Sequence, residues 1–174
     1  MALEFAHGAI QWTTADTAPS TTKVVSGLSF QPKALRFYWN GLQNAADANS
    51  NTVEGRRGVG FATGTSDRRN VTTFNDNGAG TVACASKASD DSCVALITVT
   101  GTNGGKLDVQ SINSDGFTLV VDTTPVANIT IFWEAWGGTD ITVAACCDIA
   151  EPATAVAPNY TVTGFIAGAT DQVI

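Results

Sequence analysis

The chain has 174 residues and a formal net charge of −7, with 44 % hydrophobic and only 14 % charged residues. This length suits one domain, residues 1–174, with a sizeable core. The acidic balance argues against non-specific nucleic-acid binding, and no apolar run reaches the roughly 18 residues of a membrane span. Low surface charge is expected where subunits cover one another, so the composition favours an assembled protein.

Alternation of apolar and other residues with a period of two recurs along the chain, and no helical stripe exceeds two turns. Asn-Gly and Asp-Gly pairs of the kind that tight hairpins need separate several runs. We therefore predict an all-β, two-sheet antiparallel sandwich, jelly-roll or Ig-like, with about ten short strands and little helix. The patterns lie at 9–13, 22–28, 33–39, 58–62, 70–74, 80–85, 93–100, 106–112, 116–122, 127–136, 140–147 and 160–166.

Two segments are expected to lie outside this framework. Residues 1–8 are predicted to be flexible or to contact a partner, and they lack the charged leader of a signal peptide. Residues 40–57 form a long polar stretch, which is predicted to be a loop. Loops of this length usually serve a function or contact a partner.

Two strand patterns place aromatic and charged side chains opposite their core-facing residues. In 33–39 the core face would hold Leu35, Phe37 and Trp39, and in 127–136 it would hold Ala127, Ile129, Ile131, Trp133 and Ala135. The opposite faces carry Arg36 and Tyr38 in the first strand, and Phe132, Glu134 and Trp136 in the second. These five residues are the principal candidate site.

Three interpretations of that candidate site remain open. Aromatic side chains with scattered polar groups are typical anchors of subunit interfaces, and this interpretation is favoured. The same aromatics would also stack on sugar rings, with Glu134 and Arg36 as hydrogen-bonding partners. A glycosidase would need a second carboxylate at a fixed separation, for which Asp122 is a candidate. No catalytic residue is assigned.

The four cysteines fall into two groups. Cys84 and Cys93 flank a polar loop, and either a disulfide between them or two free thiols fits that spacing. Cys146 and Cys147 are adjacent, so in a strand they would point to opposite faces, with Cys146 outward. Cys146 is then either a small apolar residue or a thiol that cross-links subunits.

Metal and cofactor chemistry finds little support in the sequence. The chain has a single histidine, His7, and no C-x-x-C motif, so neither a zinc site nor any other cofactor site is predicted. Two arginine pairs, Arg56-Arg57 and Arg68-Arg69, concentrate basic charge around residues 58–64. They are interpreted either as a basic patch that docks an acidic partner or as solvated loop charges.

Three segments carry a resemblance to a known group of proteins. "SFQPKALRFYWNG" (29–41), "SDGFTLVVD" (114–122) and "ITIFWEAWGG" (129–138) resemble parts of small β-sandwich structural proteins from the virions of tailed bacteriophages. The resemblance implies a non-enzymatic role in capsid decoration, a tail or a fibre. It brings no catalytic residue with it, and the Cys146-Cys147 pair is not part of the pattern.

The preferred hypothesis is therefore a virion structural protein that assembles with itself or with a major capsid or tail protein, most readily as capsid decoration. Such a protein would be assembled in the host cytoplasm and carried on the extracellular particle. The alternative is a carbohydrate-binding or host-receptor-binding module that uses the aromatic sheet face. A hydrolase that uses Glu134 ranks third. Neither nucleic acid nor membrane is expected as a partner.

Overall fold

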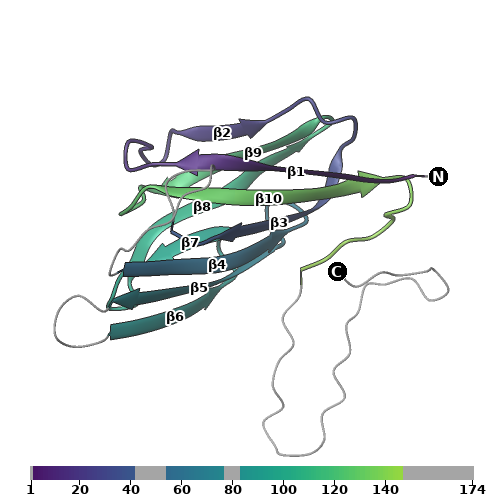
Figure 1. The fold of residues 1–174 in the computed structure, drawn as a ribbon. Helices are drawn as coiled ribbons and strands as arrows, with labels where there is room; N and C mark the ends of the chain where they lie inside the picture. The colour runs from purple at the N-terminus through teal and green to yellow at the C-terminus, as the bar shows by residue number, and fades with distance from the viewer. Residues whose placement is uncertain (1, 42–53, 77–82, 147–174) are drawn as a thin grey trace, which may run out of the picture.

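The computed structural model describes residues 2–41, 54–76 and 83–146, which form ten strands and no helix (Figure 1). These strands make two antiparallel sheets, so the predicted all-β, two-sheet architecture is confirmed. In chain order they are β1 (Leu3–Trp12), β2 (Thr22–Val25), β3 (Pro32–Trp39), β4 (Glu54–Ala62), β5 (Arg68–Asp76), β6 (Ala83–Ser89), β7 (Val94–Ile97), β8 (Asn103–Asn113), β9 (Gly116–Thr123) and β10 (Ile129–Gly138). No helix long and apolar enough to cross a membrane occurs in these ranges.

The six-stranded sheet has the order β1-β10-β3-β4-β5-β6, and the four-stranded sheet has the order β2-β9-β8-β7. In Figure 1 the six-stranded sheet lies in front of β9, β8 and β7. Non-consecutive strands pair toward one edge of the larger sheet, where β10 lies between the edge strand β1 and β3. The N-terminal and C-terminal strands of the described chain are therefore direct neighbours.

The hydrophobic core lies between the sheets, because every second side chain of each paired strand points inward. Phe117 of β9 sits near its centre, with its ring edge-on to those of Phe37 and Trp133 at centroid distances of 6.0 and 5.4 Å. The predicted inward faces of β3 and β10 are buried, apart from Ala127, which precedes β10 and is half-buried. The largest fully buried side chains are Trp12, Phe37, Phe117, Leu35, Leu96, Ile97, Leu107, Leu119, Ile129, Ile131, Val94 and Val121.

Strand β7 is buried on both faces, as the apolar run 93–100 predicts, although it is the edge of its sheet. It packs against β4 and β5 of the opposite sheet. Gly60 makes that approach possible, because a Cβ added there would lie 1.7 Å from the carbonyl oxygen of Cys93. Only glycine leaves room for two backbones this close together.

The structure corrects three expectations about chain segments. Residues 3–8 are not flexible but form most of β1, which pairs with β10 over its whole length, while their contact with a partner stays a prediction. Residues 54–57, expected within the long loop, already belong to β4. Residues 141–146 form no strand, so alternation does not fix the direction of Cys146. The expected strand at 160–166 and residues 42–53 lie outside the described part of the chain.

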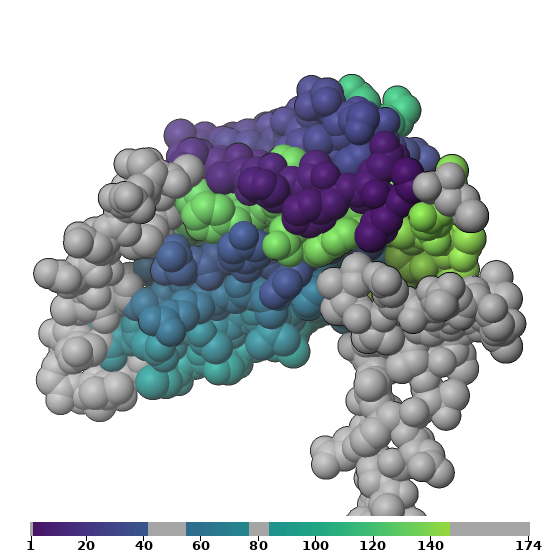
Figure 2. All heavy atoms as spheres, turned by 45° about the vertical axis from the view of Figure 1, so that its right-hand side comes forward, coloured from purple at the N-terminus to yellow at the C-terminus, as the bar shows by residue number. Residues whose placement is uncertain are grey.

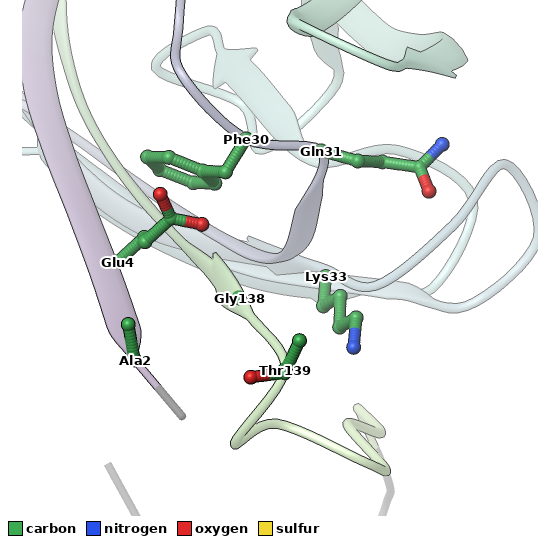
Figure 3. Close-up of a pocket in the computed structure, with 7 residues that line it drawn as sticks. All are labelled: Ala2, Glu4, Phe30, Gln31, Lys33, Gly138 and Thr139. Carbon is green, nitrogen blue, oxygen red and sulfur yellow. The ribbon is translucent and has the colours of Figure 1, made fainter.

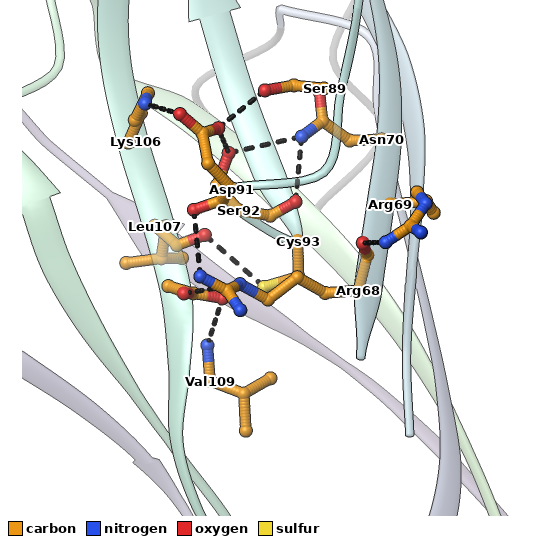
Figure 4. Close-up of polar contacts among 11 residues, drawn as sticks. Arg68, Arg69, Asn70, Ser89, Asp91, Ser92, Cys93, Lys106, Leu107 and Val109 are labelled. Carbon is orange, nitrogen blue, oxygen red and sulfur yellow. Dashed lines mark hydrogen bonds and ion pairs between the residues drawn. The ribbon is translucent and has the colours of Figure 1, made fainter. Parts of the chain in front are cut away.

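Charged and polar side chains link β5 to β8 and to the segment before β7 (Figure 4). Arg68, at the start of β5, places its Nε 2.7 Å from Asp108 Oδ2 on β8. Two residues further along β5, the Asn70 side-chain amide donates to the carbonyl oxygen of Ser92 at 2.8 Å. Nearby, Asp91 pairs with Lys106. These contacts join strands of the six-stranded sheet to the segment that leads into β7 and to β8.

The pKa values of the two acids in this cluster, Asp108 and Asp91, are shifted in opposite directions. Burial raises the pKa of Asp108 to about 6, against the lowering influence of the Val109 backbone N–H and of Arg68. Burial alone would also raise the pKa of Asp91, but hydrogen bonds from Lys106 and Ser89 outweigh it and lower that pKa to about 2. Asp91 is thus a structural acid in this network.

Candidate binding face

The outward side chains of β1, β10, β3, β4 and β5 form one surface of the six-stranded sheet, which we call the outer face. Figure 2 shows these strands succeeding one another across that side of the molecule. The strand registers align their outward residues into rows that cross the sheet. One row is Ala9, Phe132, Tyr38, Val59 and Val71; the next is His7, Glu134, Arg36, Phe61 and Arg69; a third begins Phe5, Trp136 and Ala34.

Aromatic pairs dominate the outer face. Tyr38 and Phe132 are opposite each other on β3 and β10, and their rings stack with centroids 5.4 Å apart and an interplanar angle of 17°. Phe5 and Trp136 are opposite each other on β1 and β10, with centroids 5.6 Å apart. Such cross-strand contacts are the usual stabilising unit of a sheet. They also hold the rings in fixed positions.

The exposure of these side chains is high for apolar residues on paired strands. Phe5 is 51 % exposed, Val71 50 %, Tyr38 39 % and Phe61 38 %. Tyr38 and Val71 lie in one row and Phe61 in the next, so these apolar side chains are neighbours, whereas the row of His7, Glu134 and Arg36 separates them from Phe5. An exposed apolar cluster of this kind on a folded domain is a candidate interaction site.

Glu134 lies within this surface and is not paired with a second acid. Its cross-strand neighbours are His7 and Arg36, and Arg36 Nη1 lies 3.5 Å from Glu134 Oε2. Asp122, the candidate second carboxylate, is on β9 of the other sheet and faces outward there. The structure therefore does not bring together the two carboxylates that glycoside hydrolysis needs.

The four arginines do not form the single patch that their spacing predicts. Arg57 and Arg69 belong to the outer face, opposite Thr73 and Phe61 respectively. Arg56 points to the other side, where its guanidinium lies 4.8 Å from the centroid of Phe74, and Arg68 is engaged with Asp108. Adjacent residues of a strand point to opposite faces, so each pair is split.

Of the two alternatives left open for Cys84 and Cys93, the structure has the free thiols and no disulfide between them. Cys84 is exposed on β6, whereas Cys93 is fully buried and its Sγ donates to the carbonyl oxygen of Leu107 at 3.3 Å. The two thiols thus occupy different environments. Cys146 is half-buried, and its backbone N–H donates to Asp67 Oδ2 at 2.8 Å. Cys147 lies outside the described residues.

A shallow pocket opens where β1 begins and β10 ends (Figure 3). It has a volume of about 390 Å³. Its two charged groups are already engaged: Glu4 accepts from Ser29 Oγ at 3.4 Å, and Lys33 Nζ donates to the carbonyl oxygen of Ile141. The described residues contain no group of three or more His, Cys, Asp or Glu side chains that could hold a metal ion. The outer face is therefore the stronger candidate site.

Comparisons with known proteins add little to this picture. No family model and no curated protein matches the chain. Among solved structures, the chain is similar to a tailspike protein of the Acinetobacter baumannii bacteriophage Fri1, a capsular polysaccharide depolymerase, with a TM-score of 0.26 and 10 % sequence identity. The match covers 78 % of this chain but only 18 % of that chain. At this TM-score the likeness carries no argument about function.

Proposed function

We infer that this chain is a non-enzymatic structural protein of a bacteriophage virion, which docks to a protein partner through the outer face. The partner is either another copy of the chain or a major capsid or tail protein. Capsid decoration is the favoured location, and a tail or fibre component is the alternative. The assignment to a virion comes from the three sequence segments that resemble phage structural proteins.

The exposed apolar cluster of Tyr38, Phe61 and Val71 on the outer face is the observation that carries the docking part of this proposal. Tyr38 and Phe61 are each more than a third exposed, and the ring of Tyr38 stacks on that of Phe132. Tyr, Trp, Phe and Arg are the residues enriched at protein interfaces, and all four types lie on this face. Burial of such a surface would stabilise a complex by removing apolar area from water.

A glycan-binding module is the second candidate. Arg36 and Glu134 lie beside Tyr38 and Trp136, so hydrogen-bonding groups and aromatic rings are neighbours on the outer face. The stacked pair favours a protein partner instead, because Tyr38 and Phe132 already use one ring face on each other. A sugar ring binds to the flat face of an aromatic ring.

Two valine substitutions test the docking surface. Val71 is 50 % exposed on the outer face, and Val126 is equally exposed in the segment between β9 and β10. Val71→Asp should raise the dissociation constant for the phage's own purified virions about tenfold or more, because a carboxylate would enter an apolar contact. The measurement is co-sedimentation of the labelled full chain with those virions.

Val126→Asp is the matched control on the same virions, since it makes the same chemical change in an equally exposed valine outside the outer face. We expect it to have a smaller effect on virion binding than Val71→Asp. Equal binding by wild type and Val71→Asp would reject the outer face as the docking surface. Virion binding that a soluble glycan abolishes would favour the second candidate instead.

A further inference from the structure

Charge is distributed unevenly over the two sheets. Three of the nine basic residues, Arg36, Arg57 and Arg69, lie on the outer face, together with one of the sixteen acids, Glu134. Three arginines against one glutamate give the outer face a formal charge of +2, although the chain carries −7. The rest of the chain therefore carries −9. A positive apolar surface on an acidic protein is complementary to other surfaces of that same protein.

The opposite side of the sandwich supplies a complementary surface, which we call the rear face. It comprises the outward residues of β2 and β9, namely Thr22, Val24, Thr118, Val120 and Asp122, together with Asp115 in the turn before β9. Asp115 and Asp122 are its exposed acids. Lys23 on β2 pairs with Asp16 at 2.7 Å, and on the neighbouring strand β8 Lys106 pairs with Asp91 and Asp108 with Arg68. Exposed Val24 provides apolar area between the strands' polar residues.

The charges of the two faces favour one arrangement of self-association over another. Two outer faces packed against each other would oppose a charge of +2 with another of +2. An outer face packed on a rear face would oppose arginines with Asp115 and Asp122. Like charges across an interface cost free energy and opposite charges guide the encounter, so the second arrangement is favoured. A contact between two different surfaces of one chain repeats head to tail and builds rings or filaments.

We propose that a second copy of this chain is the partner of the outer face, and that the second copy binds through its rear face. This proposal rests on the proposed function, since it names the protein partner of the same docking surface. The apolar residues of the outer face would contact Val24 and Val120, and the arginines would lie around the two acids. Each copy would then use both sheets in assembly.

Sedimentation velocity of the full chain over a concentration series tests this proposal. The wild type should associate at low ionic strength, and added salt should weaken the association. Arg57→Glu/Arg69→Glu, which reverses the outer face, should raise the dissociation constant about tenfold, and Asp115→Lys/Asp122→Lys, which reverses the rear face, should do the same. An equimolar mixture of the two double variants should regain association, because a reversed outer face is complementary to a reversed rear face.

Lys87→Glu is the matched control, because it changes charge on β6 at a residue that pairs with buried Thr72 and therefore faces away from the outer face. It should leave association unchanged, and all variants should keep the thermal midpoint of the wild type. A monomeric wild type, a mixture that stays monomeric, or a closed dimer that tolerates the rear-face variant would each overturn the proposal. A monomeric wild type that still binds virions in a Val71-dependent way would overturn this proposal alone and leave the proposed function standing.

Discussion

Phe117→Ala is expected to lower the free energy of unfolding by about 3–5 kcal/mol, the usual cost of truncating a fully buried phenylalanine. Phe117 is wholly buried between the sheets and contacts the rings of Phe37 and Trp133 edge-on. Its loss would remove both aromatic contacts and leave a cavity that the two sheets cannot close without shifting. Urea unfolding followed by tryptophan fluorescence measures the change.

Phe61→Ala is the control for this prediction, because it removes the same side chain from the outer face, where Phe61 is 38 % exposed. We expect a cost below about 1 kcal/mol there, since a solvent-facing truncation leaves no cavity. Equal losses for the two variants would mean that Phe61 is part of the core rather than of a surface. The pair therefore separates residues that hold the fold together from residues available to a partner.

Arg68→Leu is expected to cost about 3–5 kcal/mol at a pH well above 6, because it leaves the buried carboxylate of Asp108 without its partner. The pKa of Asp108 is raised to about 6 in the folded protein, mainly by burial. Removing Arg68, which lowers that pKa, would move it further upward. Urea unfolding of variant and wild type across a pH series measures the difference in stability.

The pH dependence of Arg68→Leu follows from the sign of that shift. A raised folded-state pKa means that Asp108 binds its proton more tightly in the folded protein than in the unfolded chain. Its stabilising contribution is complete below pH 3.8 and is lost as the pH rises through about 6. The cost of Arg68→Leu should therefore shrink as the pH falls. Arg68→Leu/Asp108→Asn should lose this dependence, and a cost that is constant with pH would contradict the account.

Strands with one wholly apolar face could be predicted from sequence, because burial and a period of two coincide in them. In β3 the predicted face of Leu35, Phe37 and Trp39 is the buried one, and β10 follows the same rule. The sequence predicts β1 only from residue 9, because residues 3–8 include Ala6 and Gly8, whose small side chains give little hydrophobic contrast. Pairing with β10, a contact of long sequence separation, defines residues 3–8 as strand.

The separation of the arginines within each pair follows from strand periodicity alone. Adjacent residues in a strand face opposite ways, so a strand through Arg56 and Arg57 must separate them. The partner of Arg68 could not be predicted in this manner, because Asp108 lies on the other sheet and forty residues further on. Buried ion pairs between sheets depend on how the sheets stack, and strand periodicity says nothing about that stacking.

Hydroxyl-radical footprinting of the chain, free in solution and bound to virions, tests most directly whether the outer face binds a protein. Tyr38 and Phe61 report on the outer face, and Val99, 41 % exposed in the turn between β7 and β8, is the internal reference. We predict that oxidation of Tyr38 and Phe61 falls on binding while that of Val99 stays constant. Undiminished oxidation of Tyr38 and Phe61 in the bound chain would contradict the assignment of the outer face as the docking surface.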